Sequence, residues 1–192
     1  MRLVELIIDE KDGSSGIDAV SVVESPAIEE NFIALSKHNI ELKEVDAEKR
    51  ILMGAALVPN KKIYRVNDKT KEEFEIFFSE ATVRKGMELF FKKGNQGKAT
   101  QEHDKKIDGM TVVESWLIED DVHDKSVKYG FSLPKGTWMI SMKVDNDQVW
   151  NDAKAGKVKG FSIEGYFADK LEMSMEQKKK DEIIEQLKEL LK

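Results

Sequence analysis

The stretch Lys157-Val-Lys-Gly-Phe-Ser-Ile-Glu-Gly-Tyr-Phe167 determines how the rest of the chain is interpreted. Its side chains alternate between apolar and polar, which predicts a strand with Phe161 on one face and Ser162 and Glu164 on the other. A glycine on either side of the serine removes side-chain bulk, so that another backbone or a bound chain can approach closely. A serine in this position is a candidate nucleophile, and it needs a base that accepts its proton.

One histidine is best placed to act as this base. The chain contains three histidines, and His103 lies in a polar segment directly before the strand-like run at residues 110–118. Two observations speak for less specific roles. A serine within a strand is usually a packed or exposed hydroxyl, and the stretch Gly160-Phe-Ser-Ile-Glu164 departs from the Gly-x-Ser-x-Gly elbow of hydrolases at its fifth position. Residue chemistry alone therefore leaves the pair Ser162 and His103 as a hypothesis.

The composition excludes several classes of protein. Lys and Arg number 31 and Asp and Glu number 37, a net charge of −6, and no basic cluster indicates a nucleic-acid surface. The absence of cysteine excludes disulfides, thiolate metal sites and cysteine proteases. No apolar run approaches the ~20 residues that span a bilayer, and the N-terminus, with Glu5 and Asp9, lacks the features of a signal peptide. We expect a soluble intracellular protein that binds neither nucleic acid nor membrane.

Strand-like patterns dominate the chain. Strands are predicted at residues 3–8, 17–23, 50–58, 62–66, 73–78, 110–118, 137–144 and 157–167. Helices are predicted from the N-cap Ser79 to Gly94 and from the N-cap Asn146 to Gly156. Because the helices do not alternate regularly with the strands, we expect an α+β domain around a mostly antiparallel, barrel-like sheet.

A change in composition divides the chain into a domain at residues 1–169 and a tail at residues 170–192. An apolar stripe runs along the otherwise charged tail, formed by Ile183, Ile184, Leu187, Leu190 and Leu191. Such an amphipathic helix either docks on its own domain or binds a partner, for example a second copy of the chain. No stop signal precedes Lys192, so we interpret the tail as the start of a longer, scaffold-like region.

A metal site is the competing interpretation of the residues around His103. Glu102, His103, Asp104 and Glu114 supply carboxylates and an imidazole, which are groups that bind metal ions. Their spacing fits no familiar metal motif, so we predict neither a metal ion nor a cofactor.

Four blocks of sequence resemble the phage serine proteases of the XkdF type, which are related to the prohead, or head maturation, proteases. The blocks are Gly16-Ile-Asp-Ala-Val-Ser-Val-Val-Glu-Ser-Pro-Ala27, Leu57-Val-Pro-Asn-Lys-Lys-Ile-Tyr-Arg65, Thr111-Val-Val-Glu-Ser-Trp-Leu-Ile-Glu-Asp120, and Gly136-Thr-Trp-Met-Ile-Ser-Met-Lys-Val144 with Lys159-Gly-Phe-Ser-Ile-Glu-Gly165. The resemblance implies a fold similar to that of the herpesvirus assemblins, a β-barrel flanked by helices. It also implies that Ser162 attacks the substrate and that His103 is the base.

The resemblance further implies an acidic residue that orients the histidine. In prohead proteases a segment like Glu-Val-Ser-Leu-Val, followed by Pro-Ala, comes after the serine, whereas the matching segment here, residues 18–27, precedes the histidine. This order implies a circularly permuted arrangement of strands, in which Asp18 holds His103 in the productive tautomer. Glu114, on the strand after His103, is the rival candidate.

The activity implied by the resemblance is that of a prohead endopeptidase. Such an enzyme cleaves scaffold and capsid protein segments, and itself, inside the immature phage head in the cytoplasm of the bacterial host. The alternatives are a non-catalytic assembly or scaffold factor that retains the fold, and an esterase or metal-dependent hydrolase. Proteolysis needs donors for the developing oxyanion, and backbone amides near Gly160 or Gly165 and the side chains of Arg65 or Arg84 are candidates.

Overall fold

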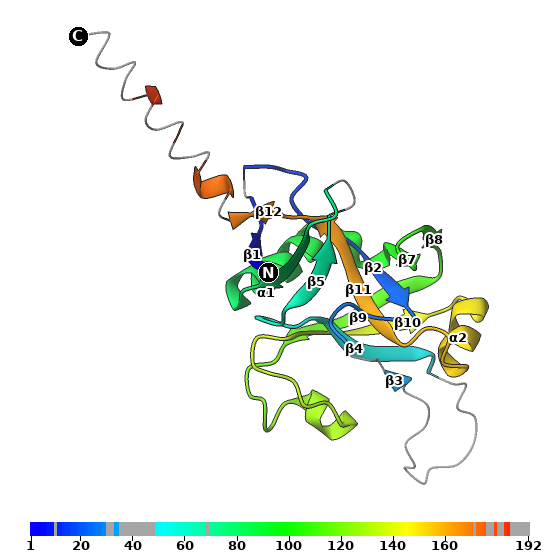
Figure 1. The fold of residues 1–192 in the computed structure, drawn as a ribbon. Coiled ribbons are helices and arrows are strands. Elements are labelled where there is room, and N and C mark those ends of the chain that lie inside the picture. Colours follow the sequence, from blue (N-terminus) through cyan, green and yellow to red (C-terminus); the bar gives the residue numbers. More distant parts are fainter. Residues whose placement is uncertain are drawn as a thin grey trace, which may run out of the picture.

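The described strands of the protein form three four-stranded sheets (Figure 1). The computed structural model describes residues 1–9, 11–29, 33–34, 49–67, 70–170, 172–175, 179 and 183–184. We name the sheets the serine sheet, with strand order β11-β2-β7-β8, the central sheet, with order β3-β4-β10-β9, and the outer sheet, with order β12-β1-β6-β5.

The serine sheet contains the predicted strand that includes Ser162. Its strands are β2 (Gly16–Val23), β7 (Ala99–Gln101), β8 (Lys105–Ile107) and β11 (Gly160–Tyr166). β11 is antiparallel to β2, and β2 is parallel to β7, so three segments far apart in the sequence lie side by side. Glu164 pairs with Ala19, whereas the next residue of β11 pairs with Ile17. Asp18 is therefore the extra residue of a β-bulge.

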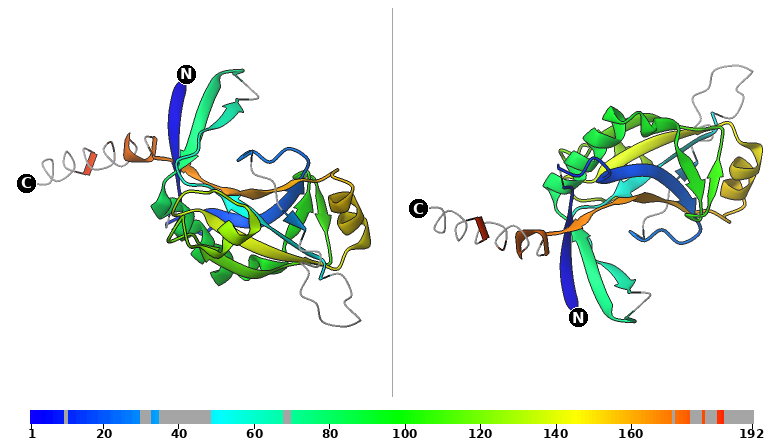
Figure 2. Two further views of the ribbon diagram at one scale, coloured as in Figure 1. Left: turned by 90° about the horizontal axis from the view of Figure 1, so that it is seen from below. Right: turned by 90° about the horizontal axis from the view of Figure 1, so that it is seen from above.

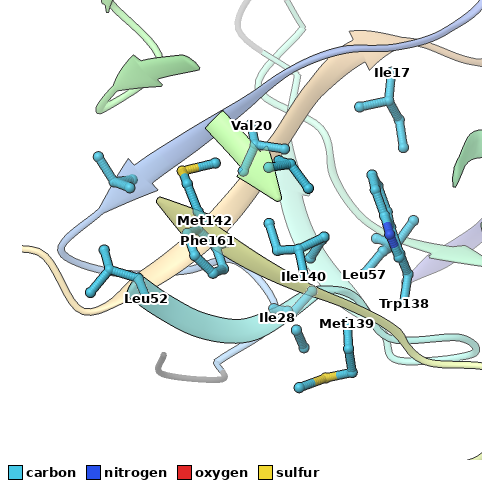
Figure 3. Packing of buried hydrophobic residues seen from close by; sticks show 14 of the residues in the cluster. Ile17, Val20, Ile28, Leu52, Leu57, Trp138, Met139, Ile140, Met142 and Phe161 are labelled. Carbon is cyan, nitrogen blue, oxygen red and sulfur yellow. The ribbon is translucent and has the colours of Figure 1, made fainter. Parts of the chain in front are cut away.

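The central sheet lies in the middle of the hydrophobic core. Its strands are β3 (Ile33–Ala34), β4 (Ile51–Leu57), β9 (Met110–Leu117) and β10 (Trp138–Val144), and all of their pairings are antiparallel. β4 and β10 are almost wholly buried, which shows that both of their faces are covered. Figure 3 shows Phe161 packed beside Met142 near these two strands, so the residue before the serine anchors β11 in the core.

The outer sheet extends away from the other two sheets (Figure 2). Its strands are β1 (Arg2–Ile7), β5 (Ile63–Val66), β6 (Glu73–Phe78) and β12 (Ala168–Asp169). β5 and β6 form the predicted antiparallel hairpin, and β1 is parallel to β6. Phe167, between β11 and β12, places its ring edge against Phe78 at a centroid distance of 4.9 Å. This contact joins the end of the serine strand to the base of the hairpin.

Both predicted helices are present, as α1 (Glu80–Lys92) and α2 (Asp147–Lys154). The Asn146 side chain caps α2 by accepting a hydrogen bond from the backbone N–H of Val149 at 3.0 Å. Ser79 occupies the N-cap position of α1, but its hydroxyl contacts the Thr82 hydroxyl instead of a backbone N–H. α1 packs against β2, where Gly86 leaves room for the Ile17 side chain.

The structure confirms the α+β class and the mostly antiparallel pairing, but it does not confirm a barrel. In the described part of the chain, β11 lies beside β4 and no ladder of hydrogen bonds joins the two strands. The serine sheet and the central sheet therefore remain separate along this seam, and the expected barrel does not close. The predicted resemblance to assemblins and the permuted strand order remain untested by this topology.

Four short elements lie where the sequence predicted only loops. They are the 3-10 helix η1 (Asn95–Gly97) with strands β7 and β8 in the polar segment around His103, and the 3-10 helix η2 (Lys125–Tyr129). β7 and β8 have three residues each, which is too short for an alternating pattern to be recognised.

Most of the tail at residues 170–192 lies outside the described residues. Those that are described there are helical, and Ile183 and Ile184 are 55% and 49% exposed. The predicted apolar stripe, the boundary after residue 169 and self-association through the tail remain predictions. Within the described residues, no helix combines the length and apolar character needed to cross a membrane.

The close approach of β2 and β11 predicts that Gly165→Ala destabilises the fold. A Cβ atom at this position would lie 2.0 Å from the carbonyl oxygen of Gly16, so one backbone must move. We expect a loss of about 3 kcal/mol in the free energy of unfolding, measured by denaturant titration. Gly97→Ala is the control, because its Cβ would meet nothing within 4 Å. Equal stability of the two variants would contradict the described packing.

Candidate active site

Ser162 lies in the middle of β11, at the edge of the serine sheet. Its neighbour Phe161 is fully buried in the core, whereas Ser162 is 8% exposed and projects from the opposite face. Ser162 is paired directly with Ser21 on β2, so the two side chains lie next to each other on one face. Among the described residues, the Ser162 hydroxyl has no hydrogen-bond partner. It is therefore available to donate its proton to a base.

Ser21 connects this face of the sheet to His103. The Ser21 hydroxyl is fully buried, accepts a hydrogen bond from the backbone N–H of His103 at 3.1 Å, and donates to the carbonyl oxygen of Thr100 at 3.4 Å. These hydrogen bonds hold the backbone of His103 next to Ser21, which pairs with Ser162.

The turn that contains His103 has a backbone conformation that L-residues rarely adopt. Glu102 and His103 have φ angles of 51° and 59°. β2 and the residue after it hold the turn in place. The backbone N–H of Glu102 donates to the Val22 carbonyl at 3.2 Å, and the Glu102 carboxylate accepts from the backbone N–H of Glu24 at 2.7 Å. Such imposed backbone conformations are concentrated at functional sites.

The imidazole ring of His103 contacts a carboxylate on the serine strand. Its Nδ1 atom lies 3.3 Å from Oε1 of Glu164, and the two side chains are 44% and 28% exposed. The Thr100 hydroxyl donates a hydrogen bond to the same carboxylate oxygen. Because Glu164 follows Ser162 by two residues in a strand, both side chains project from the same face. The ring of His103 therefore lies over the face that contains the serine.

This geometry is suited to moving a proton. With Nδ1 directed to Glu164, Nε2 is the nitrogen that remains to accept the proton of Ser162. A carboxylate at Nδ1 favours the tautomer that carries its proton there, and it stabilises the imidazolium that forms when Nε2 accepts a second proton. His103 and Glu164 thus meet on the face of β11 from which Ser162 projects.

Asp18, the acid predicted from the sequence, has a different environment. It is the extra residue of the β-bulge in β2, and its side chain is exposed. In the part of the chain that the structure describes, no hydrogen bond or ion pair joins Asp18 to His103. The orienting role of Asp18 stays a prediction that lacks a supporting contact.

Glu114, the rival candidate, lies on β9 in the central sheet. Its carboxylate accepts a hydrogen bond from the Ser141 hydroxyl at 2.7 Å and forms an ion pair with Lys125. The hydrogen bond from Lys125 lowers the pKa of Glu114, in spite of the opposite effect of desolvation. Glu114 is thus engaged by partners of its own, away from the turn of His103.

The residues considered for a metal site do not converge. The Glu102 carboxylate accepts a hydrogen bond from the backbone N–H of Glu24, the residue after β2. Glu114 belongs to another sheet. Within the described ranges, no three or more His, Asp and Glu side chains gather in a way that would hold a metal ion.

The two arginines named as oxyanion donors lie in different hollows of the surface. Arg65 lines a cavity of about 200 Å³ together with Ser162 and Gly165. Arg84 lines a separate hollow next to Trp116. Of the two guanidinium groups, only that of Arg65 shares a cavity with the serine.

The sequence analysis missed the roles of Glu164, Ser21 and Thr100. Alternation along β11 placed Glu164 on the face of Ser162, but the glutamate was interpreted only as a departure from a hydrolase motif. Recognising its role required the location of His103, which depends on the pairing of β2 with β7. Ser21 and Thr100 could not be identified without that same pairing.

Comparison with known proteins gives one match. A family model described as "Putative phage serine protease XkdF" matches residues 39–172, which include Ser162, His103 and Glu164. No curated protein and no solved structure gives a significant match to the chain.

The hydrogen bonds of Ser21 predict that Ser21→Ala loosens the histidine turn. The substitution leaves the buried N–H of His103 without an acceptor, which costs about 1–3 kcal/mol. We expect a lower free energy of unfolding and faster amide hydrogen exchange at His103, measured by NMR. Ser132→Ala, at an exposed loop serine, is the control. Unchanged exchange at His103 would show that Ser21 does not hold the turn.

Proposed function

The chain belongs to the family of phage serine proteases of the XkdF type, and we propose that it is a serine endopeptidase with Ser162 as nucleophile and His103 as general base. The observation that supports this assignment best is the contact between His103 Nδ1 and Glu164 at 3.3 Å, on the face of the sheet from which Ser162 projects. This contact leaves the other ring nitrogen for the serine.

In the proposed mechanism, Ser162 Oγ attacks the carbonyl carbon of a peptide bond while His103 accepts the hydroxyl proton at Nε2. The tetrahedral intermediate collapses, the C–N bond breaks, and His103 donates the proton to the leaving amine. Water then attacks the acyl-enzyme, with His103 again acting as base, and releases the second product together with free Ser162. The positive charge on His103 in each step is balanced by the carboxylate at Nδ1.

We assign the orienting carboxylate to Glu164. The resemblance to prohead proteases points to Asp18, but among the described residues no contact joins the exposed Asp18 side chain to the ring. Glu164 pairs with Ala19, the residue next to Asp18, across the two strands. Its carboxylate therefore reaches the region of the sheet that contains His103.

The proposed biological role is cleavage of scaffold and capsid protein segments, and of the chain itself, during maturation of a phage head in the host cytoplasm. Membership of a phage serine protease family supports a role as a phage protease. The prohead assignment, self-cleavage and an assemblin-like, permuted fold follow from the resemblance of the four sequence blocks. A non-catalytic assembly factor remains the alternative that the following experiment separates.

Ser162→Ala and His103→Ala are each predicted to lower kcat/KM for cleavage of the cognate scaffold protein by at least about 10⁴-fold, and the double variant adds little, because the residues act as one unit. Ser162→Ala should keep the stability of the wild type, since no hydrogen bond of its hydroxyl is lost among the described residues. The measurements are gel-based cleavage and labelling by a fluorophosphonate. Wild-type protein that neither cleaves scaffold nor reacts with the probe would favour the assembly factor.

Glu164→Gln is predicted to lower kcat/KM by at least about 100-fold, with the loss mainly in kcat. The kcat/KM values of Glu164→Gln, Asp18→Asn and Glu114→Gln check this assignment. A large loss in Asp18→Asn, with Glu164→Gln close to wild type, would return the role to Asp18.

A further inference from the structure

The cavity beside Ser162 has an apolar wall. It opens along the seam between β11 and β4 and reaches the base of the β5–β6 hairpin. Side chains that form this wall include Leu57, Ile63, Ile76, Phe78 and Phe167. Its volume is about 200 Å³, below the ~300–1,000 Å³ of sites that enclose a drug-sized ligand. The cavity is therefore of a size for one side chain.

Arg65 supplies the charge among the cavity-lining residues. One of its guanidinium nitrogens, Nη1, donates to the carbonyl oxygen of Tyr64 at 2.9 Å. Among the described residues, no carboxylate contacts Arg65. Arg65 pairs with Phe74 on β6, and both neighbours of Phe74 are acidic. Of these, Glu73 forms a hydrogen bond with Tyr64, and Glu75 forms an ion pair with Lys62.

The donors of Arg65 indicate an anionic ligand. Arg65 is exposed on β5, and desolvation by the groups around it lowers the pKa of its guanidinium. A guanidinium has five N–H donors in a planar fork that matches a carboxylate. A carboxylate that enters the cavity would accept hydrogen bonds from these donors and neutralise their charge.

We propose that this cavity binds the side chain of the substrate residue whose carbonyl Ser162 attacks, and that Arg65 selects an acidic side chain with an aliphatic stem, as in glutamate. This inference rests on Ser162 being the nucleophile. The methylene groups lie against the apolar wall, the carboxylate meets Arg65, and the backbone carbonyl is left at the serine, which lines the same cavity.

Two peptidyl diphenyl phosphonates test the proposal without knowledge of the natural cleavage site. They are identical except that the residue bonded to phosphorus has a glutamate-like or a glutamine-like side chain. Ser162 Oγ attacks phosphorus, the bond from phosphorus to one phenoxy oxygen breaks, and the phenol leaves with the proton that His103 accepted. The second-order rate of inactivation is measured for each compound on the full chain by mass spectrometry.

The wild type should react about 10- to 100-fold faster with the acidic compound, which corresponds to one charge-assisted hydrogen-bonded pair. Arg65→Gln should abolish this preference and retain the reaction with the neutral compound. Lys62→Gln is the matched control. It removes a positive charge next to the same strand, and that charge already has Glu75 as its ion-pair partner. It should retain the preference.

The outcomes distinguish a failure of the specificity proposal from a failure of the protease assignment. If the fluorophosphonate labels Ser162 but the wild type shows no preference for the acidic compound, the specificity proposal is wrong and the protease assignment stands. If Arg65→Gln slows both compounds equally while its thermal stability is unchanged, Arg65 stabilises the oxyanion and does not select a side chain. If no phosphorus reagent labels Ser162, both proposals fail.

Discussion

The antiparallel pairing of β2 with β11 is the constraint on which the site depends. It places Ser162 opposite Ser21, which binds the backbone of the histidine turn, and it places Glu164 where the His103 ring can reach it. The β-bulge at Asp18 shifts the register by one residue after Glu164, where β11 continues toward the outer sheet. A slip of one residue would move Ser162 and Glu164 to the core face and bring Phe161 to the surface.

The seam between the serine sheet and the central sheet forms the surroundings of Ser162, the proposed nucleophile. A closed barrel would join β11 to β4 by hydrogen bonds, but the described strands leave this edge of β11 unpaired. The cavity lies along this edge, with the serine on one wall and apolar side chains from the hairpin on another. Incomplete closure of the sheets therefore creates the space that a substrate would need beside Ser162.

The sequence was sufficient for the elements with clear periodicity, and the pair Ser162 and His103 stays a prediction. Long alternating strands and the helices α1 and α2 were predicted because their side-chain patterns are local. Strand β7, only three residues long, gave no such pattern, and its parallel pairing with β2 determines where His103 lies. Glu164 was not considered beside Asp18 and Glu114 for this reason, since its contact with the ring is non-local.

The three strands that form the site, β2, β7 and β11, come from distant parts of the chain and include its last long strand. Loops of many residues must close before these strands can pair, so the site has a high contact order and forms late in folding. During synthesis, residues 16–23 and 99–101 leave the ribosome well before β11. An emerging chain therefore lacks the strand of Ser162, and the proposed peptidase site can assemble only after β11 has been made.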